Sequence, residues 1–305
     1  MLDHHGPEAS RVAGVWWLMF VLAAVVYVVV AGLVITAIVR GRRRAAAEDP
    51  DAAGDERFIW IGGIVLPVLV LAVLAVVTVT TTRDVRSAQA GELRMTVVGK
   101  RWWWDVSYPG TGVRTANELH VPVGRTVALT LESDNVIHSF WVPQLAGKVD
   151  LIPGQRNILR FTASSAGTYR GQCAEFCGIQ HAHMAFVVIA DPPDVFARWL
   201  ARRSSGAGVT PTEEEAARGE MVFNRESCAG CHTIRGTAAQ GTLGPDLTAF
   251  GGRQSIGAGT VPNTATNLRR WIRNSQSIKP GNLMPPVALS AEDLRSLVTY
   301  LESLK

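Results

Sequence analysis

Two long stretches without a charged residue constrain this chain most strongly, because each is long enough to cross a lipid bilayer. Residues 12–39 form an uncharged run of 28 residues, and residues 58–82 form one of 25. A helix that spans a bilayer needs about 20 apolar residues. A buried core helix is the alternative, but both runs are flanked by arginines. We therefore predict an N-terminal tail and two membrane helices within residues 1–89.

The basic residues between the two runs predict how the anchor is oriented. Arg40, Arg42, Arg43 and Arg44 lie in the connecting segment, and loops rich in arginine stay on the cytoplasmic side. Both termini then face outward, and everything after Thr82 is extracytoplasmic. The chain has a net charge of +4, but its sequence contains no basic stripe interleaved with aromatic residues. We therefore expect no nucleic-acid partner.

The segment at residues 90–200 has the pattern of a β-sandwich. Short apolar stretches such as "RTVALTLES" and "QRNILRFTA" recur at roughly ten-residue spacing and are broken by Gly and Pro. Small and polar residues at 201–210 predict a linker. Residues 211–305 are expected to form a small helical domain, with capping boxes at Thr212–Glu215 and Ser290–Asp293.

The stretch "CAEFCGIQHAHM", residues 173–184, combines thiols, imidazoles and a thioether. A disulfide is one alternative, because disulfides form outside the cytoplasm. Zinc is another, since Cys₂His₂ is an ordinary zinc ligand set. Met184 favours copper, because thioether sulfur suits Cu(I) and is a poor zinc ligand. Two thiolates would allow a binuclear copper centre, for which "NVIHSFWVP" supplies a further histidine, His138.

The motifs "HSFWVP", "DLIPGQRN" and "CAEFCGIQHAHM", together with the two-helix anchor, resemble subunit II of cytochrome c oxidase over about residues 12–195. The resemblance implies a cupredoxin-like β-sandwich with a binuclear CuA site. It also implies that the Glu175 carboxylate reaches a magnesium ion at the contact with subunit I, the alternative being a surface carboxylate. The implied CuA ligands are His138, Cys173, Glu175 (through its backbone carbonyl), Cys177, His181 and Met184.

Two histidines compete for one copper position in "QHAHM". If this stretch is extended, His181 and His183 point the same way, so periodicity does not choose between them. His181 lies four residues after Cys177 and three before Met184, so a loop can form on each side of it. His183 is directly adjacent to Met184. The family motif also places its ligand four residues after the second cysteine, and we therefore expect His181 to bind copper and His183 not to.

The run "RWWWD" at 101–105 places three tryptophans in a row, and on a strand they must face alternate sides. Sandwich core is the ordinary explanation for one or two of them. In the family, an aromatic cluster at this place passes electrons to the copper. The resemblance implies Trp102 as the exposed position that receives the electron and Trp104 as its inward companion. We assign no role to Trp103.

The motif "CAGCH", residues 228–232, is the attachment signature of a c-type haem, and the alternatives are zinc or a redox disulfide. Cys228 and Cys231 would form the thioethers and His232 would bind the iron. Met284, on the proline-bounded loop "GNLMPP", is the expected sixth ligand because Met221 lies too close to Cys228. Residues 211–305 resemble a small class I cytochrome c, in which the Pro245 carbonyl of "LGPDL" would accept the His232 ring proton.

Together these resemblances imply an electron-transfer subunit of a haem–copper terminal oxidase in a bacterial-type plasma (inner) membrane. Electrons would pass from an external donor, such as a cytochrome c or a quinol–cytochrome c oxidoreductase, through haem c and CuA to subunit I. Subunit I would hold haem a and the haem–copper centre that reduces oxygen to water with proton pumping, and subunit III would be a further partner. The alternatives are the same role in a nitric-oxide reductase, or a copper-binding or assembly protein, which would need neither "RWWWD" nor a haem.

Overall fold

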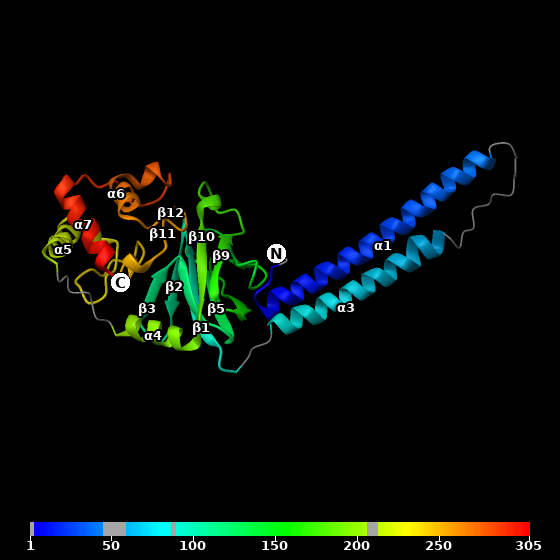
Figure 1. The fold of residues 1–305 in the computed structure, drawn as a ribbon, viewed down its shortest axis with the longest axis horizontal. Helices are drawn as coiled ribbons and strands as arrows, with labels where there is room; N and C mark the ends of the chain where they lie inside the picture. Colours follow the sequence, from blue (N-terminus) through cyan, green and yellow to red (C-terminus); the bar gives the residue numbers. More distant parts are fainter. Residues whose placement is uncertain (1–2, 45–58, 87–89, 206–212) are drawn as a thin grey trace. The chain divides into compact units, whose positions relative to one another are not determined.

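The computed structural model describes residues 3–44, 59–86, 90–205 and 213–305. These residues form two compact units. One unit holds the helix pair, and the other holds residues 3–9 with everything after residue 88. The predicted order of two apolar helices, a β-sandwich and a C-terminal helical domain is confirmed (Figure 1).

The helix pair consists of α1 (Pro7–Arg44) and α3 (Leu66–Arg86), the latter preceded by a π-helical segment η1 (Ile61–Val65). Both helices are long and apolar enough to cross a membrane. Among the described residues, no other part of the chain buries the most apolar stretch of either helix. Pro67 explains the π-helical segment, whose turns are wider than those of an α-helix. Proline lacks an N–H and its ring crowds the carbonyl four residues earlier, so the regular hydrogen-bond ladder is interrupted just before α3.

The sandwich consists of two five-stranded sheets. In the first, the strand order is β3-β2-β1-β5-β8, and β1 pairs in parallel with β5. In the second, the order is β4-β10-β9-β6-β7, and β10 pairs in parallel with β4. The strands are β1 (Leu93–Lys100), β2 (Trp103–Tyr108), β3 (Val113–Ala116), β4 (Glu118–Pro122), β5 (Val127–Ser133), β6 (His138–Trp141), β7 (Val149–Leu151), β8 (Asn157–Phe161), β9 (Gly167–Cys173) and β10 (Ala185–Asp191).

Aromatic side chains fill the sandwich core beside the copper ligands. The Trp104 ring lies edge-on to Phe140 and Phe186, with centroids 5.7 and 5.0 Å away. Edge-to-face packing of this kind is favoured by the ring quadrupoles. At Gly171, a Cβ would lie 2.1 Å from the Phe186 ring, so only glycine leaves room for that ring against β9. The loop that carries the cysteines therefore begins from a rigid, densely packed strand pair.

The segment after the sandwich corrects one predicted boundary. Helix α4 (Pro193–Ser204) continues through residues 201–204, which we expected in the linker. Phe196 and Trp199 on this helix are buried, and the Trp199 ring stacks on His120 at 4.2 Å. The apolar face of the helix packs on the sandwich, and this contact extends the helical segment beyond the composition-based boundary. Residues 206–210 of the predicted linker lie outside the described residues.

The C-terminal domain is helical, as predicted. Ser290 accepts a hydrogen bond from the Asp293 N–H and caps the last helix, which confirms that capping box. Thr212 lies outside the described residues, and α5 starts at Glu214. The elements are α5 (Glu214–Arg225), η3 (Cys228–Gly230), η4 (Phe250–Gly252), β11 (Ser255–Ile256), β12 (Val261–Pro262), α6 (Ala265–Asn274), η5 (Ser275–Ser277) and α7 (Ala291–Ser303).

Candidate metal centres

Strand ends and one loop position the predicted copper ligands. His138 opens β6 and Cys173 closes β9, and these two strands pair side by side. Cys177 lies in the loop after β9, and His181 lies in the short 3₁₀ helix η2 (His181–His183). Met184 closes the loop, where its carbonyl accepts a hydrogen bond from the Cys173 N–H at 2.9 Å. Backbone hydrogen bonds therefore tie both ends of the loop together.

The donor atoms of these residues converge on one place. The two cysteine sulfurs lie 3.7 Å apart. The Cys173 Sγ lies 3.8 Å from the His138 Nδ1 and 3.3 Å from the Glu175 carbonyl oxygen. The Cys177 Sγ lies 3.8 Å from the His181 Nδ1 and 3.9 Å from the Met184 Sδ. Donors bound at about 2.0–2.3 Å to shared metals in a tetrahedral arrangement are separated by about 3.3–3.8 Å, so these spacings fit a metal cluster.

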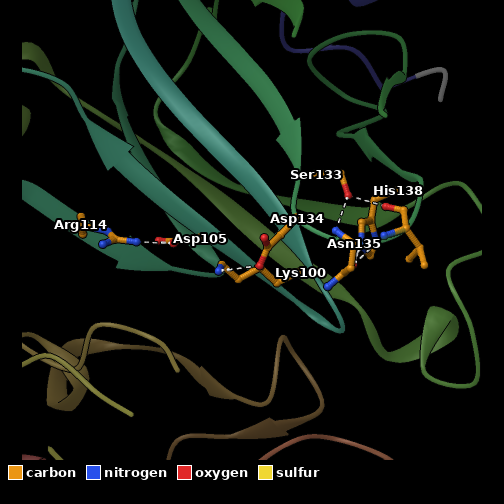
Figure 2. A network of polar contacts seen from close by, with 8 residues as sticks. Lys100, Asp105, Arg114, Ser133, Asp134, Asn135 and His138 are labelled. Carbon is orange, nitrogen blue, oxygen red and sulfur yellow. Dashed lines mark hydrogen bonds and ion pairs between the residues drawn. The ribbon is translucent and has the colours of Figure 1, made fainter. Parts of the chain in front are cut away.

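A neighbouring polar network orients His138. The Asn135 Oδ1 lies 3.3 Å from the His138 Nε2, so that ring nitrogen can donate to the amide (Figure 2). The Nδ1 is then left for a metal, as histidine ligands require. Asp134, immediately before Asn135, forms an ion pair with Lys100. The Lys100 Nζ and the Asp134 Oδ2 lie 3.0 Å apart. Sequence reasoning missed Asn135, although its position three residues before a ligand histidine was visible.

Gly99 on β1 is a second residue that sequence reasoning missed. A Cβ at this position would lie 2.7 Å from the Cδ2 of His138. A contact of that length is too short for any side chain. Glycine at 99 therefore lets the His138 ring approach the first sheet and reach its position beside Cys173.

The electrostatics of the cysteine pair suit metal binding. Both cysteines are buried, and neither is in a disulfide. The hydrogen bond between the two sulfurs lowers the pKa of the Cys173 thiol to about 3 and raises that of Cys177. Two adjacent sulfurs with pKa values shifted in opposite directions favour sharing of a proton, and a metal that displaces that proton would gain two thiolate ligands.

His183 and Glu175 have partners of their own. The His183 Nδ1 lies 3.0 Å from the Gln180 Oε1, and its side chain is exposed. The stretch is a 3₁₀ turn and not extended, so the two histidines do not face the same way and only His181 points to the sulfurs. The Glu175 carboxylate lies 3.6 Å from the Lys148 Nζ, and both side chains are about half exposed.

The tryptophans correct one expectation. Trp102 lies in the turn between β1 and β2 and is only 9% exposed, so our prediction of an exposed position is wrong. Its ring is covered by the C-terminal domain, where a Cβ at Gly281 would lie 3.6 Å from the Trp102 Cη2. The Trp102 Nε1 donates to the Cys177 carbonyl oxygen at 2.8 Å. Trp104 is fully buried, as expected, and its ring centroid lies 6.0 Å from that of His138.

The "CAGCH" turn has the geometry that a covalent haem needs. The His232 Nδ1 lies 2.8 Å from the Pro245 carbonyl oxygen, so the Nε2 is left for iron. A Cβ at Gly244 would lie 2.5 Å from the His232 Cε1, so glycine there lets the chain pass close beside the ring. Burial lowers the pKa of His232, which keeps the imidazole neutral for metal binding.

The remaining predicted haem ligands lie on the same domain. Cys228 and Cys231 are half-buried free thiols. The Met284 Sδ accepts a hydrogen bond from the Trp271 Nε1 at 3.2 Å. Met221, which we rejected as a ligand, is 63% exposed on α5. This donor set of two thiols, one imidazole and one thioether fits a c-type haem.

Comparison with known proteins agrees with both sites. Residues 111–191 match the family described as "Cytochrome C oxidase subunit II, periplasmic domain", and residues 216–305 match "Cytochrome c". The cytochrome c oxidase subunit 2 of Alkalihalophilus pseudofirmus is 36% identical over 312 aligned residues, which cover 100% of this chain and 90% of that protein. The chain belongs to the cytochrome c oxidase subunit 2 family.

A second curated relative accords with this membership. The cytochrome c oxidase subunit 2 of a Bacillus species (strain PS3) is 33% identical and aligns with 87% of this chain and 79% of that protein. The solved periplasmic domain of subunit II of cytochrome oxidase from Bradyrhizobium japonicum is 29% identical. It covers 39% of this chain and 98% of that chain, with a TM-score of 0.38.

Membership assigns this oxidase subunit its general role. It is a subunit of a cytochrome c oxidase, an oxidoreductase, and membership of the subunit 2 family implies association with subunit I. Its two soluble domains imply CuA copper and haem c, and the donor sets described above suit both groups. The periplasmic domain and the two apolar helices fit a membrane protein with extracytoplasmic soluble domains.

Proposed function

We propose that this subunit carries electrons from an external donor through a covalent haem c to a binuclear copper centre, and from there to subunit I. The observation that carries the proposal is the link between Trp102 and the copper site. The Trp102 indole donates to the carbonyl oxygen of Cys177 at 2.8 Å, while the C-terminal domain covers the same ring. One aromatic side chain thus contacts both domains that hold the proposed cofactors.

The residues of the copper site would each have a distinct task. Cys173 and Cys177 would supply two thiolates to the copper centre, with His138, His181, Met184 and the Glu175 carbonyl completing the ligand set. When bound, the copper pair and the haem iron each accept and release one electron. Asn135 holds the His138 tautomer, and the packed sheets keep the donors in place between oxidation states. A rigid donor set is what fast electron transfer requires, because little has to move.

The residues of the haem site would divide in the same way. Cys228 and Cys231 would form the thioether bonds, and His232 and Met284 would supply the imidazole and thioether ligands of the iron. The Pro245 carbonyl holds the His232 ring by its Nδ1. A thioether axial ligand raises the potential of a haem, which suits a group that passes electrons on to copper.

The wider assembly follows from the same proposal. The arginines at the C-terminal end of α1 would lie in the cytoplasm, and both soluble domains outside it. The Glu175 carboxylate would leave Lys148 and bind magnesium at subunit I, since carboxylate oxygen suits that ion. Subunit I would reduce oxygen to water with proton pumping, and subunit III would complete the complex. A cytochrome c or a quinol–cytochrome c oxidoreductase would supply the electrons.

Metal analysis of the purified full complex, with visible and near-infrared spectra, tests the proposal. We expect one covalent haem c and two coppers in this subunit, in addition to the copper that subunit I would hold, and a near-infrared band from the copper pair. Reduction of the haem by a photochemical donor should be followed by reduction of the copper. Zinc in place of copper, or a haem that is reduced without the copper following, would contradict the proposal.

A further inference from the structure

Lys279 is a buried cation at the contact between the two soluble domains. It belongs to the C-terminal domain, follows η5, and is 2% exposed. Its Nζ donates to the carbonyl oxygen of Trp102 at 2.8 Å and to that of His183 at 2.7 Å, both in the sandwich. It donates its third bond to the carbonyl oxygen of Gly257, in its own domain, at 2.7 Å. An ammonium has three protons, and all three are used here.

The placement of these bonds is unusual for a lysine. Burial lowers the pKa of Lys279 to about 7, although the neighbouring Cys177 sulfur opposes this shift, so the charged form of this side chain would be more stable on the surface. Three carbonyl oxygens offset that cost only while both domains are in contact. The buried charge of Lys279 therefore has all its hydrogen-bond partners only when the two domains are in contact.

A second, independent contact lies beside Lys279. The Ala185 N–H, at the start of β10, donates to the Ala258 carbonyl oxygen at 2.9 Å. Residues 257–259 all have positive φ, of 66°, 62° and 78°. Two of the three are glycines, which adopt this conformation without strain. The turn can therefore approach the strand edge closely, and a Cβ at Gly259 would lie 3.0 Å from the Ala185 Cβ.

Gln180 adds a third contact. Its Nε2 donates to the carbonyl oxygen of Pro280 at 2.8 Å, and its side chain is buried. Lys279, Pro280 and Gly281 precede Met284 on the same loop. On the other side, Gln180 lies in the loop of the predicted copper ligands, Ala185 follows that loop, and the Trp102 indole donates to it. The contact thus joins the loop that carries the proposed haem ligand to the loop that carries the proposed copper ligands.

We propose that Lys279 is a positioning residue that locks the C-terminal domain onto Trp102, so that electron transfer between the two domains occurs from one docked arrangement without a prior domain movement. The proposal rests on the function proposed above. It implies that Trp102 accepts electrons from the attached domain, and that a separate donor protein reaches only the haem domain.

Lys279→Met in the full oxidase complex tests this directly. Methionine keeps the length and apolar stem of lysine but donates no hydrogen bond. Both metal spectra should remain as in the wild type, because none of the proposed ligands is changed. Haem-to-copper transfer should slow by about tenfold or more, since small misplacements cost large factors in rate. It should also become slower in viscous solvent, because the domains must first dock again.

Hydrogen exchange supplies a readout that does not depend on electron transfer. The segment containing the Ala185 amide should exchange faster in Lys279→Met than in the wild type, since the Ala258 carbonyl leaves it. Lys279→Gln, which retains two donors, should recover part of both the protection and the rate. Lys305→Met, at the exposed C-terminus, is the matched control and should change neither.

The outcomes separate the inference from the proposed function. Wild-type transfer kinetics and exchange in Lys279→Met would overturn the positioning role. If the wild-type protein transfers no electron from haem to copper, the proposed function fails, while exchange at Ala185 still reports whether Lys279 holds the domains together. If Lys279→Met does not assemble, Gln180→Ala removes the neighbouring bond to Pro280 and should give the same changes in smaller measure; unchanged transfer kinetics and exchange in it would overturn the inference.

Discussion

The two proposed metal sites of this chain are built by different means. The predicted copper donors come from paired strands and one tied loop, and neighbouring donor atoms lie 3.3–3.9 Å apart. In the haem domain, His232 is held by Pro245, but the Met284 sulfur accepts a hydrogen bond from Trp271. Sites built on strands are positioned more precisely than sites on loops. We therefore expect the copper site to tolerate changes in its surroundings better than changes in its ligands, and the haem site to depend strongly on Met284.

The largest expected effect comes from exchanging one histidine of the copper loop. His181→Asn should abolish or grossly alter the binuclear copper spectrum, because the His181 Nδ1 lies against the Cys177 sulfur. His183→Asn is the matched control two residues away and should leave the spectrum nearly intact, since that ring is bonded to Gln180. Near-infrared absorption and electron paramagnetic resonance would measure both, and the reverse outcome would reject the ligand assignment.

Loss of the haem methionine should have the next largest effect. Met284→Ala should leave the haem attached, because the thioethers come from Cys228 and Cys231. Its potential should fall by on the order of 100 mV or more, since axial ligands control haem potentials. Redox titration of the visible spectrum measures this change. Met221→Ala, on an exposed face of α5, is the control, and an unchanged potential in Met284→Ala would show that another residue is the ligand.

Substitution of Trp102, whose indole contacts both domains, should change the rate of electron transfer but not the metal spectra. Trp102→Ala removes the donor to the Cys177 carbonyl oxygen and the ring covered by the haem domain. Transfer from haem to copper should slow while both metal spectra persist. Trp103→Ala changes the adjacent ring, which lies under the Lys100 ammonium, and should transfer at the wild-type rate. Normal kinetics in Trp102→Ala would return this residue to a packing role.

The smallest expected effect is at Asn135. Asn135→Ala removes the partner of the His138 Nε2, so the copper site should keep its metals but shift in potential. Asp134→Ala breaks only the exposed pair with Lys100 and should leave the potential unchanged. Potentiometric titration of the near-infrared band compares the two variants. Loss of copper from Asn135→Ala would mean that the sheet holds His138 less firmly than we infer.

Much of this architecture could be predicted because it depends on patterns within short stretches of sequence. Alternation and spacing predicted the sandwich, and the Ser290–Asp293 pair predicted the start of the last helix, which its side-chain bond confirms. The cysteine and histidine spacing, with the family resemblance, named donors that the structure brings together. These features depend on residues close in sequence or on a motif with its own chemistry.

What could not be predicted depends on contacts between distant segments. The family resemblance implied an exposed Trp102, but the C-terminal domain, more than 170 residues later in the chain, packs against this residue. Residues 201–204 looked like linker, but Trp199 and Phe196 bind the end of α4 to the sandwich. The roles of Gly99 and Lys279 are likewise invisible in a local window, since each is defined by a neighbour brought by the fold.

The kinetics of electron transfer within the intact complex test the central claim most directly. Because donor and acceptor lie in one chain and in contact, haem-to-copper transfer should be first order and independent of protein concentration. It should respond weakly to ionic strength, since no encounter between separate charged surfaces is involved. A transfer rate that rises with protein concentration, or that falls steeply with added salt, would contradict the account.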